Sequence, residues 1–278
     1  MPELPEVETV RRGIEAKVVG RKILSVEVGR ERSVRRTGRE VVIHGLTGTT
    51  VTNARRRGKY LLCDLDSGDE MMIHLRMSGR VLVEPVGTKR PTHTHVVLSL
   101  SERDGVSDEM WFVDPRTFGE VVVFDPAYTA QVLPELVRLG VDPICEPFDS
   151  AILAGRLKGK RGAIKPLLLS QHVVAGIGNI YRSEILWRQK VHPKTPGNQI
   201  TRAVFDQLWN DAVLLLEIGV KNNAIITVDG VKKSRSKYGE RVNIFGKLVC
   251  PACATNIETF SLATRRVFVC ASCQPPPA

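Results

Sequence analysis

The hydrophobic pattern of the chain changes its period about halfway along, and this change limits the fold more than any other feature. Between residues 22 and 125, seven short apolar runs are separated by turn residues: KILSVEV, EVVIHGL, YLLCDL, MMIHLRM, HVVLSL, MWFVD and EVVVFD. This spacing is typical of an antiparallel sandwich or barrel. From residue 150 onward the patterns become helical, as in SAILAGRLKG, AIKPLLLSQ, RSEILWRQK and RAVFDQLWNDAVLLLEIG. The sequence therefore predicts an α+β protein with a β domain followed by a helical domain.

The first ten residues, MPELPEVETV, predict a helix that begins near Pro5. Apolar residues recur after it at helical spacing, namely Val7, Val10, Ile14 and Val18. A proline near the first turn and Gly20 near the end match the asymmetry of helix termini. The pattern therefore places Pro2 and Glu3 at the N-terminus of this helix.

Three folded parts and a linker are expected along the chain. Residues 1–138 hold the first helix and the β domain, and the stretch VDPICEPFD falls in a linker at residues 139–149. Residues 150–246 form a helical domain, in which the polar and basic segment 221–242 is expected to be a loop. Residues 247–278 form a separate small module. A chain of 278 residues with 42% hydrophobic composition is long and apolar enough for several such parts.

The formal charge of +10 is concentrated in the C-terminal half of the chain. Residues 1–148 contain 21 Lys and Arg against 22 Asp and Glu, whereas residues 149–278 contain 19 against 8. A basic face that only improves solubility is one explanation. The excess coincides, however, with the turn and cysteine motifs of the same half, and this favours a polyanionic partner such as nucleic acid.

The N-terminus shows no export signal. It is acidic and has no apolar signal-peptide core, and no apolar run approaches the roughly 20 residues that a membrane helix needs. We therefore expect a cytoplasmic protein, associated with the nucleoid through DNA and without a membrane partner.

Four of the six cysteines have the spacing of a zinc site. The pattern C-x2-C-x16-C-x2-C consists of Cys250, Cys253, Cys270 and Cys273. Two such pairs can supply four thiolates to one tetrahedral zinc, which leaves no open position for catalysis. A pair of disulfides is the alternative, but it requires an oxidising compartment that nothing in the sequence indicates. Cys63 and Cys145 are predicted to be small core residues.

The stretch ETFSLATRRVFV between the two cysteine pairs predicts a β-hairpin. Arg265 and Arg266 lie near its tip in this prediction. An arginine at such a tip can enter a DNA groove or bind a phosphate, although an ordinary solvated turn would also carry one.

A second motif is the turn VVAGIGN, which lies between two helical patterns in AIKPLLLSQHVVAGIGNIYRSEIL. Its two glycines allow a tight turn whose backbone N–H groups, with the Asn179 amide, can hold a phosphate. Any helix–turn–helix can use glycine in this way, so the turn alone is a weak indication of function.

Several motifs follow one another in a characteristic order: PELPEVETV, RRRGKYLL, HLRMSGR, DPRTFG, VVAGIGNIYRSE and the four cysteines. Together they resemble the formamidopyrimidine-DNA glycosylase family, also called the Fpg/Nei or helix–two-turn–helix glycosylases. The resemblance covers nearly the entire chain, and the ELPEVET start is similar to the Fpg branch. It implies an N-terminal helix with an antiparallel β-sandwich, a helical helix–two-turn–helix domain and a β-hairpin zinc finger.

The resemblance also implies an activity. The family members are bifunctional DNA glycosylases and AP lyases that excise oxidised bases, such as 8-oxoguanine and formamidopyrimidines, in base excision repair. The implied partner is damaged double-stranded DNA, bound by a monomer. One structural zinc is expected, and no organic cofactor.

Removal of Met1 would give Pro2 an unusual chemical role. It would expose a secondary α-amine, and α-amines have pKa values of about 7.7–8.0, against about 10.4 for lysine. The positive end of a helix disfavours the charged form further. Such an amine can attack the sugar C1′, expel the damaged base and form an iminium intermediate before the strand is cleaved. A capped helix start explains the other residues of PELPEVE but not a proline directly after Met1.

Other roles follow from the resemblance alone. Glu3 handles protons at the sugar ring, Lys59 is a second catalytic acid or base, and Glu6 supports the pocket. Met77, Arg116 and Phe118 fill the space left by the everted nucleotide, which suits a flexible apolar side chain, a hydrogen-bond donor and an aromatic wedge. The DNA backbone is bound at four further positions, namely His93, Lys165, Asn179 and Arg265. Of these, Arg265 is also expected to take part in catalysis. His95 in the same HTH stretch is an alternative to His93.

Two departures from the family pattern leave the lesion preference open. The segment 221–242 lacks the Gly- and Thr-rich stretch typical of the loop that caps an everted purine, and IFGKLVC before the finger is two residues shorter than expected. An enzyme that prefers oxidised pyrimidines or abasic sites, and a non-catalytic protein that binds damaged DNA, therefore remain alternatives. An RNA-binding protein would fit the charge but would leave Pro2, Glu3 and Lys59 unexplained. The preference for the opposite base is also open, and so is the removal of Met1.

Overall fold

The computed structural model divides into two compact units. It describes residues 2–145, 151, 155 and 161–277. Residues 2–3 and 7–138 belong to the first unit, and residues 4–6 belong to the second with the described residues from 139 onward. Among the described residues, no helix combines the length and the apolar character that crossing a bilayer requires.

The first helix, α1 (Leu4–Lys17), begins one residue before the predicted Pro5. The carbonyl oxygen of Glu3 accepts a hydrogen bond from the Val7 N–H at 3.2 Å, so Glu3 stands at the N-cap position. Val7 and Ile14 are buried in the core of the first unit. The prediction that Pro2 and Glu3 lie at the start of a helix is confirmed.

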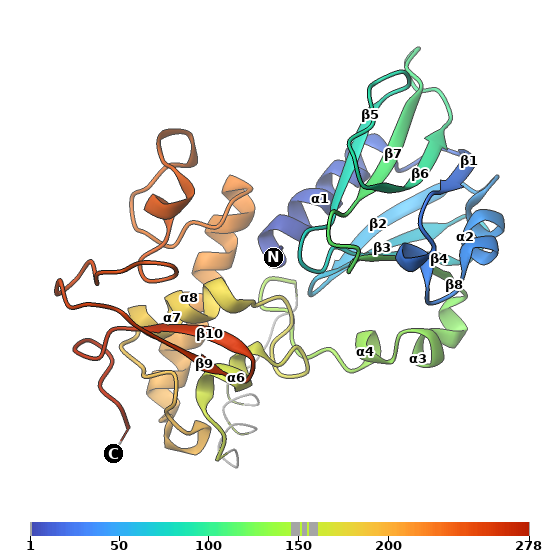
Figure 1. The fold of residues 1–278 in the computed structure, drawn as a ribbon. Coiled ribbons are helices and arrows are strands. Elements are labelled where there is room, and N and C mark those ends of the chain that lie inside the picture. Colours follow the sequence, from blue (N-terminus) through green and yellow to red (C-terminus); the bar gives the residue numbers. More distant parts are fainter. Residues whose placement is uncertain (1, 146–150, 152–154, 156–160, 278) are drawn as a thin grey trace. The chain divides into compact units, whose positions relative to one another are not determined.

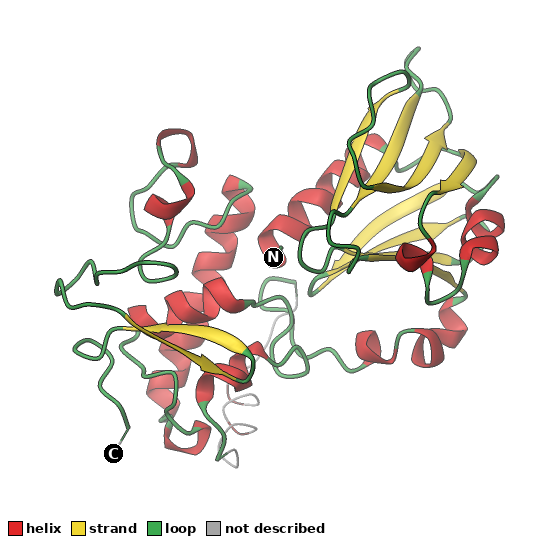
Figure 2. Cartoon of the chain, in the orientation of Figure 1, coloured by secondary structure: helices red, strands yellow, loops and turns green. Residues whose placement is uncertain are grey.

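Two four-stranded antiparallel sheets form the first unit (Figures 1 and 2). The strands of the first sheet, in spatial order, are β1 (Ile23–Val28), β6 (Thr94–Leu100), β7 (Asp108–Val113) and β5 (Arg80–Pro85). Those of the second are β2 (Val51–Arg57), β3 (Tyr60–Leu65), β4 (Glu70–His74) and β8 (Glu120–Phe124). Side chains of both sheets, such as Leu98 and Phe112 in the first and Leu61 and Ile73 in the second, meet in one core. The predicted sandwich is therefore confirmed.

The prediction of a strand at EVVIHGL is wrong, because this stretch forms helix α2 (Arg39–Leu46). Val42 and Leu46 are buried while Val41 is exposed, which is the i, i+4 spacing of a helical face rather than the alternation of a strand. The β-branched residues favoured a strand, but packing of this face against the core decides the local structure.

Two strands were not predicted. β2 reads VTNARRR, which is too polar to be recognised, and its buried residues Val51, Ala54 and Arg56 do not alternate strictly because a register shift interrupts the strand. β5 lies at the edge of its sheet and is only half-buried, so its residues form a weak pattern. The remaining short elements of this unit are η1 (Glu31–Val34), η2 (Pro126–Tyr128), α3 (Thr129–Val132) and α4 (Pro134–Val137).

The second unit is helical, as predicted. Its described elements before the finger are α6 (Ile164–Leu169), α7 (Asn179–Arg188), η3 (Gly197–Gln199), α8 (Arg202–Asn222), η4 (Lys233–Arg235) and η5 (Tyr238–Arg241). The predicted helix SAILAGRLKG lies, apart from residues 151 and 155, outside the described residues, as does the end of the predicted linker. Residues 223–242 form a loop with two short 3-10 turns.

A glycine in the turn before α7 brings two parts of this unit into close contact. Gly176 has a φ of 94°, and its carbonyl oxygen accepts a hydrogen bond from the Leu4 N–H at 3.1 Å. A Cβ atom at this position would lie only 2.4 Å from the Leu4 side chain, so glycine is required both for its conformation and for its size. The N–H of Gly176 donates to the Gln171 side chain at 3.0 Å and is therefore already used within the protein.

Glu184 on α7 connects the helical part to the segment that leads into the finger. Its fully buried carboxylate accepts hydrogen bonds from the backbone N–H groups of Asn243, Ile244 and Phe245 at 2.7–2.9 Å. It also accepts from the Thr227 hydroxyl at 2.6 Å. Several N–H and O–H donors thus satisfy the oxygens of one buried carboxylate, so this contact holds the segment in place.

The finger contains the predicted hairpin, formed by β9 (Glu258–Leu262) and β10 (Arg265–Val269). Ala263 and Thr264 make the turn with φ values of 48° and 61°. Two positive φ angles are characteristic of a turn that normally contains Asn and Gly, so the turn is locally strained. Arg265 follows directly and pairs with Leu262 at the end of the hairpin.

Candidate nucleic-acid interface

Pro2 and Glu3 lie immediately before α1, where the unpaired backbone N–H groups of the first turn give a partial positive charge. Pro2 is half-buried and Glu3 is buried. An amine on Pro2 would therefore be restricted in its motion and placed where its uncharged form is favoured.

Arg56 links α1 to the turn that carries Lys59. Its Nε donates to a Glu8 carboxylate oxygen at 3.2 Å, and its Nη1 donates to the carbonyl oxygen of Gly58 at 2.9 Å. Burial raises the pKa of Glu8, but the hydrogen bonds and charges of Arg11 and Arg56 outweigh burial and lower the pKa overall. Glu8 is thus ionised at neutral pH, and Lys59 is buried at the end of a turn fixed by this contact.

The carboxylate of Asp114 fastens two loops of the first unit to each other. One loop carries Met77, and its Ser78 hydroxyl donates to Asp114 at 2.5 Å. The other carries Arg116, whose backbone N–H donates at 3.2 Å, while the Gly119 N–H donates at 2.7 Å. Asp114 is fully buried, which raises its pKa, but these hydrogen bonds outweigh burial and lower the pKa overall.

The side chains presented by these loops are accessible. Phe118 is 40% exposed although it is a large aromatic residue, Arg116 is exposed, and Met77 is half-buried. The Arg116 guanidinium lies 5.0 Å from the centre of the Phe118 ring and that of Arg32 lies 5.9 Å from it. An exposed ring between two cations suits contact with stacked bases and phosphates better than it suits plain solvent.

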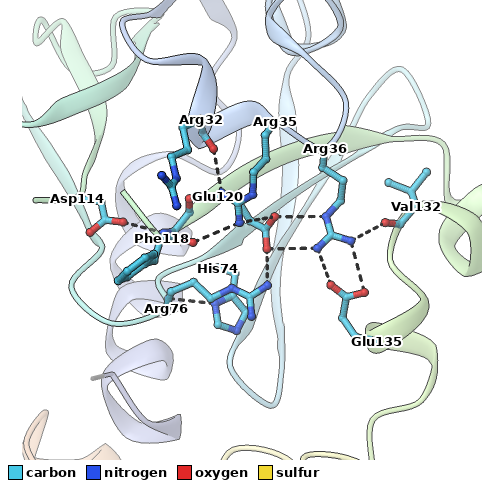
Figure 3. A network of polar contacts seen from close by, with 11 residues as sticks. Arg32, Arg35, Arg36, His74, Arg76, Asp114, Phe118, Glu120, Val132 and Glu135 are labelled. Atoms are coloured by element: carbon cyan, nitrogen blue, oxygen red, sulfur yellow. Dashed lines mark hydrogen bonds and ion pairs between the residues drawn. The ribbon is translucent and has the colours of Figure 1, made fainter. Parts of the chain in front are cut away.

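Three arginines converge on the buried carboxylate of Glu120, as Figure 3 shows. Arg76 Nη2 lies 2.6 Å from Glu120, and nitrogens of Arg36 and Arg35 lie 3.3 and 3.4 Å from it. Arg36 also pairs with Glu135 at 2.7 Å. Burial raises the pKa of Glu120, but the hydrogen bonds from Arg76 and Arg36 lower it overall. Three cations thus face two carboxylates, so the network has a net positive charge.

This network also holds the main chain of the loop that carries Phe118. Arg35 donates to the carbonyl oxygens of Phe118 and Gly119, each at 3.4 Å (Figure 3). The Arg76 N–H donates to His74 Nδ1 at 3.0 Å, which leaves the proton of the neutral ring on Nε2. Burial, and then the charge of Arg76, lower the pKa of His74 to about 3, so His74 is neutral at physiological pH.

The two histidines of the HTH stretch differ in accessibility. His93 is exposed and has a φ of 67°, whereas His95 is buried with its Nε2 2.8 Å from the Asp114 carbonyl oxygen. His95 therefore has a structural role in the first unit. His93 is the accessible histidine of the pair.

In the second unit, Lys165 and Asn179 converge on one acceptor. The Lys165 ammonium and the Asn179 Nδ2 each lie 3.3 Å from the carbonyl oxygen of Arg266 on β10. The ammonium also lies 3.3 Å from the Ser183 hydroxyl. Burial, and then the charge of Arg182, lower the pKa of Lys165 to about 7. The ammonium has three N–H donors and the amide has two, so each keeps one N–H beyond these contacts that can bind an anionic oxygen.

The side chain of Arg265 is not part of that cluster. It is exposed at the tip of the hairpin, where it is free to reach a groove or a phosphate, and only the main chain of the neighbouring Arg266 contacts Lys165 and Asn179. The prediction of an arginine at the hairpin tip is therefore confirmed in position.

The four cysteines of the finger come together as a metal site requires. Their sulfur atoms all lie within 4.8 Å of one another. Three of the separations are 3.4, 3.5 and 3.8 Å, between Cys253 and Cys270, Cys253 and Cys273, and Cys250 and Cys273. Tetrahedral zinc with Zn–S bonds of about 2.3 Å would place sulfur atoms about 3.8 Å apart. The cluster could thus bind one structural zinc.

Sequence reasoning missed the residues that hold the candidate site together. Asp114 was inside the quoted motif DPRTFG, and an Asp before Pro commonly bonds to nearby backbone N–H groups, so a signal existed. Glu120 had a weaker signal, as an acidic residue at the start of an otherwise apolar strand. Nothing in the local pattern of α7 indicated that Arg182 would be buried.

Two family models match this chain. The one described as the formamidopyrimidine-DNA glycosylase N-terminal domain matches residues 1–121. The one described as the formamidopyrimidine-DNA glycosylase H2TH domain matches residues 139–229. The order of the two agrees with the order of the two units.

Curated relatives match along the whole chain. The formamidopyrimidine-DNA glycosylase of Lactococcus lactis subsp. lactis is 35% identical over 279 residues, which cover 99% of this chain and 99% of the relative. That of a Nocardioides species is 36% identical over 284 residues, which cover 100% of this chain and 95% of the relative.

Solved structures are similar to the same extent. The complex of Lactococcus lactis Fpg with DNA containing an abasic site has a TM-score of 0.85 and 32% identity. The structure of MutM with DNA containing carbocyclic 8-oxo-G has a TM-score of 0.86 and 33% identity. A further Lactococcus lactis complex contains an oxidised pyrimidine and has a TM-score of 0.85 and 33% identity. Each comparison covers 99% of this chain and 100% of the other.

Proposed function

The chain belongs to the formamidopyrimidine-DNA glycosylase family, and from this membership we propose that it is a bifunctional DNA glycosylase and AP lyase of base excision repair. Its substrates are oxidised bases in double-stranded DNA, with 8-oxoguanine and formamidopyrimidines preferred. One observation carries the proposal. The match extends over the full chain, and within it Pro2 and Glu3 lie together at the start of a helix, where a nucleophilic amine and a carboxylate are needed.

In this proposal the α-amine of Pro2 forms a bond to C1′ of the damaged nucleotide. The bond from C1′ to the base breaks, and the base leaves with a proton. The nitrogen then loses its own proton, the bond from C1′ to the ring oxygen O4′ breaks, O4′ takes up a proton, and the nitrogen becomes an iminium. Loss of a proton from C2′ then drives β-elimination of the 3′ phosphate, and hydrolysis of the iminium releases Pro2. Glu3 and Lys59 carry protons in these steps, which suits two buried titratable groups on elements joined through Arg56.

Binding of the duplex involves both units. Met77, Arg116 and Phe118 fill the space that the everted nucleotide leaves, and the accessibility of Phe118 and Arg116 supports this role. The exposed His93 binds the backbone. In the second unit Lys165 and Asn179 bind one phosphate. Arg265 reaches the DNA from the hairpin tip and contributes to catalysis there.

The zinc has a structural role. Cys250, Cys253, Cys270 and Cys273 would hold it, and four thiolates leave no position for a substrate. Bound zinc would fix the hairpin that carries Arg265. We propose that the protein acts as a monomer in the cytoplasm, where genomic DNA is its partner.

A set of defined duplexes tests the proposal. Each would contain 8-oxoguanine, a formamidopyrimidine, an oxidised pyrimidine, an abasic site or undamaged guanine at one position, and strand nicking would be measured on a gel. We expect nicking at the first two and at the abasic site, and none at guanine. Nicking of the pyrimidine and abasic duplexes alone would favour an enzyme specific for those lesions. Specific binding to damaged DNA without nicking would favour a non-catalytic protein.

The affinity for DNA should fall as the pH rises through about 7. Burial and the neighbouring Arg182 lower the pKa of free Lys165 to about 7, and a bound phosphate would raise it. Binding therefore takes up a proton above pH 7, and between pH 6 and pH 8 we expect a loss of about tenfold in affinity. Titrations monitored by fluorescence anisotropy would measure it. Lys165→Arg should flatten the decline because arginine stays charged, whereas Lys190→Arg at an exposed position should leave the decline unchanged.

A further inference from the structure

Arg182 on α7 has an unusual environment for an arginine, because it is 1% exposed. Its Nη1 donates to the carbonyl oxygen of Lys165 at 3.0 Å, and its Nη2 donates to the side-chain oxygen of Asn179. One guanidinium therefore contacts both residues to which the proposed function assigns a DNA phosphate. We propose that Arg182 is a positioning residue, which directs the Asn179 amide and the Lys165 ammonium toward the same phosphate oxygen.

The direction of the Asn179 amide follows from hydrogen-bond chemistry. A side-chain amide has an acceptor oxygen and a donor nitrogen, and the two are interchangeable by rotation. A guanidinium has donors alone, so Arg182 can bond only to Oδ1. The Nδ2 must then lie on the other side, where it is 3.3 Å from the Arg266 carbonyl oxygen. Without Arg182, the amide could turn its oxygen toward a phosphate and repel it.

The position of Lys165 depends on the same group. Its ammonium lies 3.3 Å from the carbonyl oxygen of Arg266, which marks where the two donors meet. Arg182 holds the main chain at Lys165, near the start of α6, through its second nitrogen. The Ser183 hydroxyl donates to the Asn179 carbonyl oxygen at 2.8 Å and keeps the first turn of α7 in place beside it.

Arginine is suited to this task, and lysine is not. The planar guanidinium carries donors on separate nitrogens, and Arg182 uses Nη1 and Nη2 for two acceptors on different helices. An ammonium on the same stem is a single point and can serve both acceptors only with poor geometry. The inference rests on the proposed function, because the phosphate itself is part of that function.

A double-mutant cycle tests the inference. The full-length protein would be titrated with a duplex that contains a tetrahydrofuran abasic-site analogue, in the forms Arg182→Met, Asn179→Ala and both together. We expect Arg182→Met to weaken binding by about tenfold in the wild-type background, the size of one well-placed hydrogen bond. In the Asn179→Ala background the same change should have an effect below about threefold, because the contact with Asn179 is already absent and only the effect through Lys165 remains.

Two further variants keep the test decisive. Arg182→Lys retains the charge and should still bind DNA more weakly than the wild type, so a folding failure of Arg182→Met would not end the test. Arg202→Met removes an exposed arginine of the same unit and should leave affinity within about twofold. Thermal unfolding of each variant would separate loss of fold from loss of binding. In the cycle itself, a purely structural Arg182 would weaken binding equally in both backgrounds.

The outcomes separate the two proposals. Equal loss in both backgrounds, or wild-type affinity in Arg182→Met and Arg182→Lys, would overturn the positioning role while leaving the glycosylase proposal intact. Failure of the wild-type protein to bind or nick damaged duplexes would instead overturn the proposed function.

Discussion

An N-terminal extension that cannot be removed will abolish covalent trapping of the protein on DNA by borohydride. The reagent reduces an iminium to a stable amine, so a trapped adduct requires the free α-amine of Pro2. The extended protein should retain nearly normal affinity for the duplex, because the DNA contacts proposed for the two loops, for Lys165 and for Asn179 do not involve that amine. Denaturing gels would show the adduct, and mass spectrometry of the cross-linked peptide should identify residue 2.

Matched substitutions make this result specific. Pro2→Gly keeps an α-amine, although a primary one, and should retain part of the trapping. Glu3→Gln keeps the amine and should slow base release by about 100-fold, because it removes the ionisable group next to the sugar. Normal trapping by the extended protein would mean that the nucleophile lies elsewhere, and Lys59 would then be the first residue to examine.

Loss of zinc should have the second large effect. Cys270→Ser removes a fully buried ligand from the small core that contains Ile244 and Phe268. Structural zinc contributes on the order of 10 kcal/mol to the folding of such modules, far more than the hydrogen bonds of one hairpin. We expect the hairpin to lose its order and DNA affinity to fall by more than 100-fold. Arg265 would be lost, and so would the Arg266 carbonyl oxygen that orders the two phosphate-binding residues Lys165 and Asn179. The sheets of the first unit should stay folded, because their core is separate.

Metal content and limited proteolysis would measure this effect. The wild-type protein should contain one zinc per chain, and Cys270→Ser should contain less and be cleaved near the finger. Cys145→Ser, a thiol outside the four-cysteine cluster, should keep both the metal and the resistance to protease. One zinc per chain in a variant with all four finger cysteines replaced by serine would contradict the site.

Much of the fold could be predicted because its signals are local. The spacing of Val7, Ile14 and Val18 indicated α1, and alternating or continuous apolar runs indicated most of the strands. α2 was mistaken for a strand because Val41, Val42 and Ile43 favour strands, while its buried face at Val42 and Leu46 is defined only by packing. β2 was hidden because its polar and basic residues are placed in a strand by pairing with β3 rather than by their own preference.

The candidate site divides in the same way. Four cysteines at this spacing, and a proline after Met1, suit chemical roles that few other residues can fill. The sequence therefore pointed to them as candidates, and the structure brings the four cysteine sulfur atoms together. Asp114 and Arg182 act through contacts across 36 and 17 positions of sequence, and such contacts exist only after the chain has folded. The carboxylate of Glu120 is likewise defined by three arginines from two separate turns, Arg35 and Arg36 after η1 and Arg76 after β4.

The contacts of Asp114 have a consequence for how the protein meets DNA. Ordering a backbone residue lowers conformational entropy, at a free-energy cost of about 1–2 kcal/mol. In the loops that carry Met77 and Arg116 this ordering is already complete in the folded protein, because one carboxylate bonds to both of them. The wedge proposed for Met77, Arg116 and Phe118 would therefore be preformed when it meets a duplex, and little of the binding free energy would be spent on ordering these loops. Differences between duplexes must then arise chiefly from the DNA, since a weakly stacked or mispaired nucleotide deforms around a rigid wedge more easily than a sound base pair.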